Sequence, residues 1–362
     1  MIAAVDDPAL PEFARLTDRR GLARLLNGLD WLLEPDGVRA ALRLRWKPGR
    51  SLRIGAVVPT ALGAAAVLVA AFGPGSRSKA DKLAEWSALR GAPVHRTGDI
   101  VAIPAGADPT LDGLIPSGVP LGYNPVRRWV GWCAGQAVKV HAVAPPPGVA
   151  ALLTDPSRLL TRHLPAAEVA HNSRVVRTAW LPGTSPTAAE LPIVREALTT
   201  LHSCPPPAGL PVLDADTVLH AAQAATQSVA ATLPLERVRL ATLLAALRRA
   251  CGSGRWPAPT SLVHGDFSAD QVVVVPGGRA MLLDLDRAAV GPPGWDAAHW
   301  VVAQLAVDAP VLPAPTAPSP ILVLAAALLR APEPFRRLRP AWPQLTRAVL
   351  DAAAESAREA AS

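Results

Sequence analysis

Residues 261–287 read SLVHGDFSADQVVVVPGGRAMLLDLDR. Two runs of apolar residues joined by a Pro-Gly-Gly turn predict a β-hairpin. Such a hairpin places Gln271, at the start of one strand, beside Asp284, at the end of the other. Asp266 lies in the loop before the first strand and is expected next to them. The stretch therefore predicts a cluster of oxygen-bearing side chains at one end of a hairpin.

Phosphoryl transfer needs a cluster of this kind. One carboxylate accepts or orients the proton of the attacking hydroxyl, and further oxygen atoms hold Mg²⁺ against the phosphates. Asp266 suits the first role, and Asp284 with Gln271 suits the second. Asp286 either holds a second metal ion or turns outward, and both alternatives stay open.

The spacing resembles that of the aminoglycoside phosphotransferase and choline kinase superfamily. The resemblance is carried by His264-Gly265-Asp266, Gln271, Leu283-Asp284 and Asp296. Gln271, where asparagine is commoner, is similar to the maltokinase branch, whereas Gly291-Pro292-Pro293 departs from the family's Gly-Asp-Pro. The resemblance implies ATP as phosphate donor, Mg²⁺ as cofactor, and a small-molecule hydroxyl as acceptor: a sugar, an amino-alcohol or an antibiotic-like metabolite. It puts Asp266 and His264 in the catalytic set, with His264 bracing the loop.

Two further segments resemble the nucleotide-binding parts of that family. Lys139, in Ala137-Val138-Lys139-Val140, resembles the strand lysine that contacts the nucleotide phosphates. Asp155 and Glu168 are both candidates for its ion-pair partner. The hinge resemblance lies at Trp180-Leu181-Pro182-Gly183 and implies that the main chain of Thr178, Ala179, Trp180 and Leu181 faces the adenine.

Two small sheet-rich units followed by a large helical unit predict an α+β fold, and the resemblance implies that it is protein-kinase-like and bilobal. Residues 1–118 are expected to form an N-terminal cap subdomain, residues 119–182 a small antiparallel-sheet N-lobe, and residues 183–362 a helical C-lobe with the catalytic loop. Trp46–Arg50 and Tyr123–Arg127 resemble each other weakly. This weak similarity has two possible origins, which are chance similarity of two proline turns and an internal duplication.

Helical periodicity predicts a helix over Arg15–Leu33 and further helices over 186–202 and 215–250. His202, near the end of the second, is expected to be structural. The apolar stretches Ala64–Phe72 and Ile321–Leu329 are too short to span a bilayer.

The net charge of +7 comes almost wholly from arginine. Two explanations of this charge stay open. One is drift in amino-acid composition together with solubility, and the other is a basic cleft that binds nucleotides or other anions. Nucleic acid binding is not expected, since no basic stripe is interleaved with aromatic residues. Three scattered cysteines and an N-terminus without a signal-peptide pattern favour a cytoplasmic protein with no membrane partner. The sequence indicates no oligomeric state.

A catalytically weak or inactive pseudokinase, acting as a ligand- or protein-binding module, is the alternative. The lack of a glycine-rich phosphate loop and the undecided partner of Lys139 favour it, whereas the retention of Asp266, Gln271 and Asp284 opposes it. The helical part after Asp296 offers few acids, namely Asp308 and then Glu333. A cationic aminoglycoside is therefore less expected as acceptor than a neutral sugar or alcohol.

Overall fold

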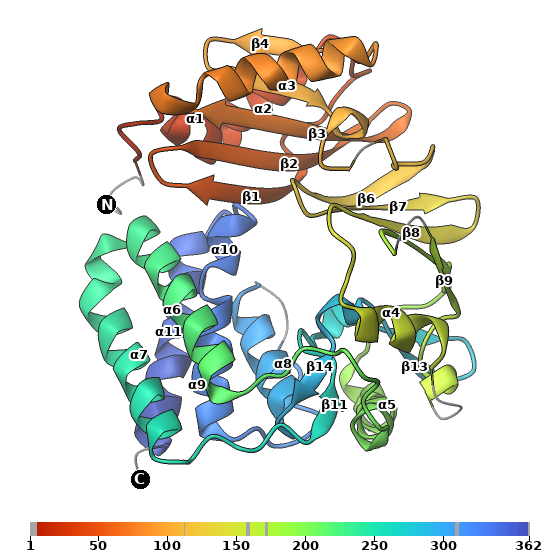
Figure 1. The fold of residues 1–362 in the computed structure, drawn as a ribbon, viewed down its shortest axis with the longest axis vertical. Coiled ribbons are helices and arrows are strands. Elements are labelled where there is room, and N and C mark those ends of the chain that lie inside the picture. Colours follow the sequence, from red (N-terminus) through yellow and green to blue (C-terminus); the bar gives the residue numbers. More distant parts are fainter. Residues whose placement is uncertain (1–5, 112, 157–159, 171–172, 308–310, 361–362) are drawn as a thin grey trace. The chain divides into compact units, whose positions relative to one another are not determined.

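The computed structural model describes residues 6–111, 113–156, 160–170, 173–307 and 311–360. Its contacts divide the chain into two units (Figure 1). Unit 1 comprises Met1–Ala144, Ala170–Trp180 and Phe335–Pro340, and unit 2 comprises Pro145–Val169, Leu181–Pro334 and Ala341–Ser362. Residues 335–340 thus belong to unit 1 although they come late in the sequence. The predicted boundaries at residues 118 and 182 stay predictions.

Two five-stranded sheets are formed by the first half of the chain. The first has the order β1-β2-β3-β5-β4, and its strands are β1 (Ala41–Lys47), β2 (Ser51–Thr60), β3 (Gly63–Phe72), β4 (His95–Thr97) and β5 (Ile100–Pro104). The second has the order β6-β7-β8-β10-β9, and its strands are β6 (Val119–Asn124), β7 (Arg128–Cys133), β8 (Gln136–His141), β9 (Ala167–Ala170) and β10 (Val175–Ala179). The strand over Ala64–Phe72 and the strand carrying Lys139 are confirmed.

The two sheets repeat one topology. In each, the fifth strand in sequence lies between the third and the fourth. In each, a helix separates the third strand from the fourth along the chain: α3 (Ser78–Leu89) and α4 (Pro147–Thr154). The shared order favours duplication over chance as the origin of the weak sequence echo.

Both sheets contribute to one core within unit 1. Leu68, Ala70 and Ile103 of the first sheet share a buried cluster with Trp129 and Val140 of the second. A glycine is required where β2 meets β6, because a Cβ on Gly55 would lie 2.5 Å from the carbonyl oxygen of Tyr123. The Tyr123 hydroxyl donates to Oδ2 of Asp108 at 2.6 Å, and burial followed by this carboxylate raises the pKa of Tyr123.

The predicted helix over Arg15–Leu33 is wrong in extent. The chain forms α1 (Phe13–Thr17) and α2 (Arg19–Asn27), separated by Asp18. Asp18 adopts an extended conformation, and its carboxylate accepts from the backbone N–H of Gly21 at 2.8 Å. An acidic N-cap of this kind starts a new helix, which periodicity alone does not reveal.

Unit 2 is mainly helical. Its helices include α5 (Leu191–Ser203), α6 (Ala215–Thr232), α7 (Arg237–Gly252), α8 (Trp295–Leu305), α9 (Pro320–Arg330) and α11 (Trp342–Glu359). Helix α10 (Glu333–Arg336) begins in unit 2 and ends in unit 1. The helix predicted over 186–202 begins only at Leu191, after a capping box at Thr187 and Glu190. The helix predicted over 215–250 is two helices, since Pro234 interrupts it.

The apolar stretch Ile321–Leu329 lies within helix α9. Almost every residue from Ile321 to Leu328 is buried, and α6, α7, α8 and α11 all contact this helix. A helix that is apolar on all sides is the expected centre of a helical core. Within the described part of the chain, no helix is both long enough and apolar enough to cross a membrane.

Two short antiparallel strand pairs complete unit 2. The first joins β11 (Ser261–Val263) to β14 (Ala289–Gly291), and the second is the predicted hairpin of β12 (Val272–Val275) and β13 (Arg279–Leu282). Antiparallel sheets in unit 1 and helices in unit 2 confirm the predicted α+β class.

Candidate active site

The loop from His264 to Gln271 connects β11 to β12 and carries the predicted cluster. Gly265 has a φ of +82°, and a Cβ at this position would lie 2.0 Å from the carbonyl oxygen of Arg287. Only glycine combines that left-handed conformation with so close an approach of two backbones. The middle residue of the His-Gly-Asp motif is thus dictated by the geometry of the loop.

Asp296 fixes the backbone at the start of this loop. Its fully buried carboxylate accepts the backbone N–H of His264 at 2.8 Å and that of Gly265 at 2.9 Å. Nε2 of His202 lies 3.0 Å from Oδ2 of the same carboxylate. Asp296 also stands in the first turn of α8, where the helix dipole favours a negative charge. Both oxygens of Asp296 are therefore engaged in positioning, and His202 is structural as expected.

His264 has its contacts inside the protein. Its Nε2 lies 2.6 Å from the carbonyl oxygen of Leu283, so this nitrogen carries the proton and donates. Its Nδ1 is buried with no hydrogen-bond partner, and the ring stands 5.6 Å from that of Phe267. The bond to Leu283 fixes the residue that precedes Asp284. This geometry gives His264 a positioning role.

Asp266 is half-buried on this loop, with 30% of its side chain exposed. Oδ1 forms an ion pair with Nη2 of Arg330, which also donates to the Asp266 carbonyl oxygen at 3.2 Å. Nε of Arg287 lies 3.7 Å from Oδ2. Two guanidinium groups therefore orient the predicted proton acceptor. Sequence reasoning missed both, since Arg330 stands at the end of an apolar helix that gives no signal of a site.

Arg330 is itself held by His299. Nε of Arg330 donates to Nδ1 of His299 at 3.1 Å, and both residues are buried. Burial lowers the pKa of His299 well below its usual range, and the positive charges of Arg330 and Arg287 lower it further. The imidazole is therefore neutral, which leaves Nδ1 free of a proton to accept from the guanidinium.

Gln271 and Asp284 are brought together as predicted. The backbone N–H of Leu283 donates to the carbonyl oxygen of Gln271 at 2.8 Å, which extends the β12–β13 ladder by one step. Asp284 adopts a left-handed conformation with φ 59° and ψ 50°, which L-residues rarely take outside special sites. Gln271, Asp284 and Asp286 are each half-buried.

The donors in this cluster fit magnesium. Amide and carboxylate oxygens are the ligands that Mg²⁺ prefers, and the ion commonly keeps several waters. In the described residues, no group of three or more His, Cys, Asp and Glu side chains forms a metal site by itself. Two protein ligands, with phosphate oxygens of a substrate, are thus what Gln271 and Asp284 offer, and Asp286 is adjacent in sequence.

Of the residues predicted to bind the nucleotide, Leu181 belongs to unit 2 and the others belong to unit 1. The two candidate partners of Lys139, Asp155 and Glu168, belong to unit 2. Lys139 is half-buried in β8, opposite Val130 of β7 and Val176 of β10. The choice between Asp155 and Glu168 as its partner stays open. Thr178 and Ala179 end β10, and the backbone N–H of Trp180 donates to the Gly135 carbonyl oxygen at 3.0 Å.

Residues 175–340 match the family model described as the phosphotransferase enzyme family (APH). Over this stretch the chain is therefore similar to members of the phosphotransferase enzyme family. The match confirms the predicted superfamily and the predicted enzyme class, a phosphotransferase. The maltokinase branch stays a prediction. No curated protein matches the sequence significantly.

Solved structures of phosphotransferases are similar to this chain, though distantly. A choline/ethanolamine kinase family protein from Mesorhizobium loti is 15% identical, with 70% of this chain and 96% of that chain covered and a TM-score of 0.45. Choline kinase LicA from Streptococcus pneumoniae is 10% identical, with 68% and 97% covered and a TM-score of 0.47. A spectinomycin phosphotransferase solved with ADP and spectinomycin is 10% identical, with 67% and 92% covered and a TM-score of 0.46. The assignment rests on the family match.

Proposed function

We propose that this phosphotransferase moves the γ-phosphate of ATP to a hydroxyl group of a small, uncharged or weakly charged molecule. The observation that carries the proposal is the arrangement of the loop from 264 to 271: its backbone is clamped by Asp296, and its partly exposed carboxylate, Asp266, is oriented by Arg330. A loop held this firmly, with a partly exposed acid that two arginines orient, is suited to positioning an attacking hydroxyl.

In the proposed reaction, the carboxylate of Asp266 accepts the proton of the acceptor hydroxyl. The hydroxyl oxygen bonds to the γ-phosphorus, the bond from that phosphorus to the bridging oxygen breaks, and ADP leaves with the bonding pair. Mg²⁺, when bound, neutralises charge on the phosphate oxygens. Gln271 and Asp284 supply the protein oxygens for it, with Asp286 as a further candidate. His264 fixes the strand end that carries Asp284 through its bond to the Leu283 carbonyl oxygen.

For unit 1 we propose the roles that the sequence resemblance implies. Lys139 contacts the nucleotide phosphates, and the main chain of Thr178, Ala179, Trp180 and Leu181 faces the adenine. Support comes from the half-buried position of Lys139 on a central strand of its sheet, between β7 and β10.

The acceptor class follows from the charges around Asp266. Arg330 and Arg287 both pair with this carboxylate, so its negative charge is already compensated by protein groups. A polycationic aminoglycoside would have to compete with these arginines for Asp266, whereas a neutral sugar or alcohol needs no ion pair there. Glu333 is half-buried, and Asp308 lies outside the described residues.

The test is a transfer assay with ATP and Mg²⁺ against two panels, one of neutral sugars and polyols and one of aminoglycosides. ADP release above the acceptor-free rate with a neutral compound, lost in Asp266→Asn, supports the proposal. Turnover of kanamycin-like compounds at an ordinary rate, with none for neutral acceptors, would overturn the acceptor class. Wild-type rates retained in Asp266→Asn would overturn the assigned proton acceptor.

A further inference from the structure

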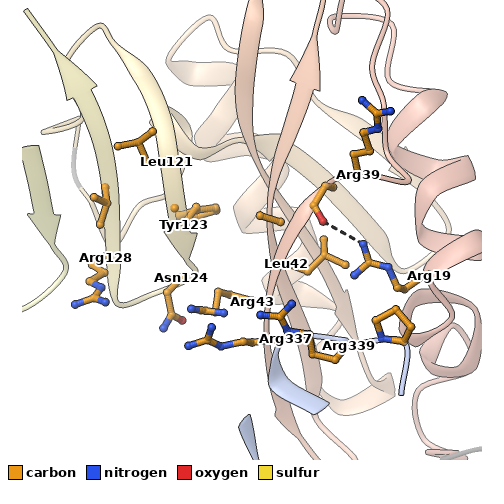
Figure 2. A pocket seen from close by; sticks show the side chains of 15 residues that line it. Arg19, Arg39, Leu42, Arg43, Leu121, Tyr123, Asn124, Arg128, Arg337 and Arg339 are labelled. Atoms are coloured by element: carbon orange, nitrogen blue, oxygen red, sulfur yellow. Dashed lines mark hydrogen bonds between the residues drawn. The ribbon is translucent and has the colours of Figure 1, made fainter. Parts of the chain in front are cut away.

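Unit 1 contains a pocket of about 470 Å³ that the proposed function does not use. Figure 2 shows its lining, with Arg43, Arg337 and Arg339 grouped beside Asn124. The lining comes from α2, from β1 and the residues before it, from β6 and β7, and from the segment 337–340. Six arginines line it: Arg19, Arg39, Arg43, Arg128, Arg337 and Arg339.

The pocket collects positive charge without acidic residues. None of the residues that line it is Asp or Glu, and all of them belong to the described part of the chain. Arg19 donates to the carbonyl oxygens of Val38 at 3.0 Å and Ala40 at 3.3 Å, which fixes its guanidinium but cancels none of its charge. Arg39 pairs with Asp36, but its side chain is 82% exposed, where an ion pair contributes little.

Neighbouring arginines increase this charge. Arg43 and Arg45 alternate along β1 with Leu42 and Leu44, which are buried, so the two arginines project to the same face. Burial lowers the pKa of Arg45, and the positive charges of Arg127, Arg336 and Arg53 lower it further. None of these four arginines lines the pocket, so they add to the positive field around it without contacting a ligand inside it.

The segment 335–340 is fixed in place within unit 1. The rings of Phe335 and Trp46 are 6.3 Å apart in an edge-to-face contact, and Arg19 donates to the carbonyl oxygen of Leu338 at 3.1 Å. Leu338 adopts a φ of +45°, a conformation that costs a leucine free energy. The fold therefore carries Arg337 and Arg339 to the pocket wall on a short, strained and anchored piece of chain.

We propose that this arginine pocket binds the phosphate groups of a small molecule. The planar guanidinium group donates two parallel hydrogen bonds to phosphate oxygens, which makes arginine the preferred residue for such recognition. The volume suits one small ligand. Binding of phosphate in this pocket does not depend on the proposed function, since none of the residues that line the pocket has a role in it.

Two sources of phosphate are compatible with this chemistry. Val130 lines the pocket and lies directly opposite Lys139 in the β7–β8 ladder, so both side chains project to the same face of the sheet. Because Lys139 is proposed to contact nucleotide phosphates, these phosphates are one source, and this alternative rests on the proposed function. A phosphorylated metabolite without a base is the other, and the experiment separates them.

The experiment is calorimetric titration of the full chain with inorganic pyrophosphate at low ionic strength. Wild type is compared with Arg43→Gln and Arg337→Gln, and Arg20→Gln is the matched control, because Arg20 is exposed on the same helix as Arg19 and outside the pocket. We expect wild type and Arg20→Gln to bind alike, and each pocket variant to bind about tenfold more weakly or worse. A thermal melt of each variant shows that it is folded.

Titration of pyrophosphate in the presence of saturating ATP then identifies the source. Competition supports nucleotide phosphates in the pocket, and unchanged binding supports a phosphorylated molecule without a base. Absence of pyrophosphate binding up to about 10 mM, or an equal loss in Arg20→Gln, would overturn the proposal. An enzyme without detectable phosphate transfer would still bind pyrophosphate, so the two proposals fail separately.

Discussion

Nε2 of His202 lies 3.0 Å from Oδ2 of Asp296, and through this contact helix α5 is tied to the start of helix α8. The same carboxylate accepts two backbone N–H groups of the loop that carries Asp266. One buried acid thus connects two helices and the candidate catalytic loop. The role of Asp296 is to position these elements, because both of its carboxylate oxygens are engaged by protein groups and neither is left for a substrate.

Asp296→Asn is expected to destabilise unit 2 and to reduce phosphate transfer. An asparagine of the same shape turns an NH₂ group toward one of the present donors, which leaves a buried N–H without an acceptor. The loss in free energy of unfolding should be about 2–4 kcal/mol, measured by urea denaturation. Asp30→Asn, at an exposed position of unit 1, is the control and should unfold like wild type. Equal stability of the two variants would contradict the assigned role.

Arg330→Gln is expected to lower kcat about 10- to 100-fold with a small change in KM, because Asp266 loses its orienting partner while substrate contacts stay. Arg287→Gln should have a weaker effect. The Arg287 side chain is 53% exposed and lies 3.7 Å from the carboxylate, whereas only 10% of Arg330 is exposed. Steady-state kinetics of both variants check this order, and a larger loss in Arg287→Gln would reverse the assignment.

Gly265→Ala should abolish most activity and destabilise the chain, because the added Cβ meets the Arg287 backbone in a left-handed conformation. Gly277→Ala, in the hairpin turn, is the matched control. Gly277 also has a positive φ, but nothing lies within 4 Å of its Cβ position. That variant should lose only about 1–2 kcal/mol of stability and keep its activity. Thermal melts and transfer assays distinguish the two, and similar behaviour would argue against a tightly packed loop.

Stability should fall as the pH is lowered below about 6.5, the ordinary pKa of histidine, in part because of His299. The pKa of His299 is lowered in the folded protein, so between the folded and the unfolded pKa the unfolded chain binds more protons. The free energy of unfolding therefore rises with pH in this window and is lost as the pH falls through it, by at most about 1.4 kcal/mol per pH unit.

His299→Gln should flatten this pH dependence of stability, measured by urea denaturation between about pH 5 and pH 7.5. His220→Gln, at an exposed position of α6, is the control and should keep the wild-type slope. If His299→Gln retained the full slope, other groups would account for the acid sensitivity.

The sequence predicted those site residues that lie close together along the chain. His264, Asp266, Gln271 and Asp284 lie within 21 residues, and hairpin geometry alone brings the ends of that stretch together. The type of fold followed from the same stretch. Arg330 could not be predicted, because it lies 64 residues from Asp266 and meets it only through the packing of α9 in the core.

Helix boundaries were predicted less well, for a different reason. Periodicity reports which face of a helix is buried, but not where the chain interrupts it. Asp18 and Pro234 each introduce a break that depends on one residue within a continuous apolar pattern. The arginine pocket could not be predicted from the sequence either, because its arginines lie on segments that are far apart in the sequence and come together only in the folded chain.

The central claim is that Asp284, with Gln271, holds Mg²⁺ for a bound nucleotide. Its most direct test is calorimetric titration of wild type and Asp284→Ala with ATP, with and without Mg²⁺, and with Asp270→Ala as control because Asp270 is exposed on the same loop. We predict Mg²⁺-enhanced binding to wild type and Asp270→Ala, at about 4–8 kcal/mol, and loss of the enhancement in Asp284→Ala alone. No binding of ATP by wild type at high concentration, or an unchanged Mg²⁺ effect in Asp284→Ala, would contradict it.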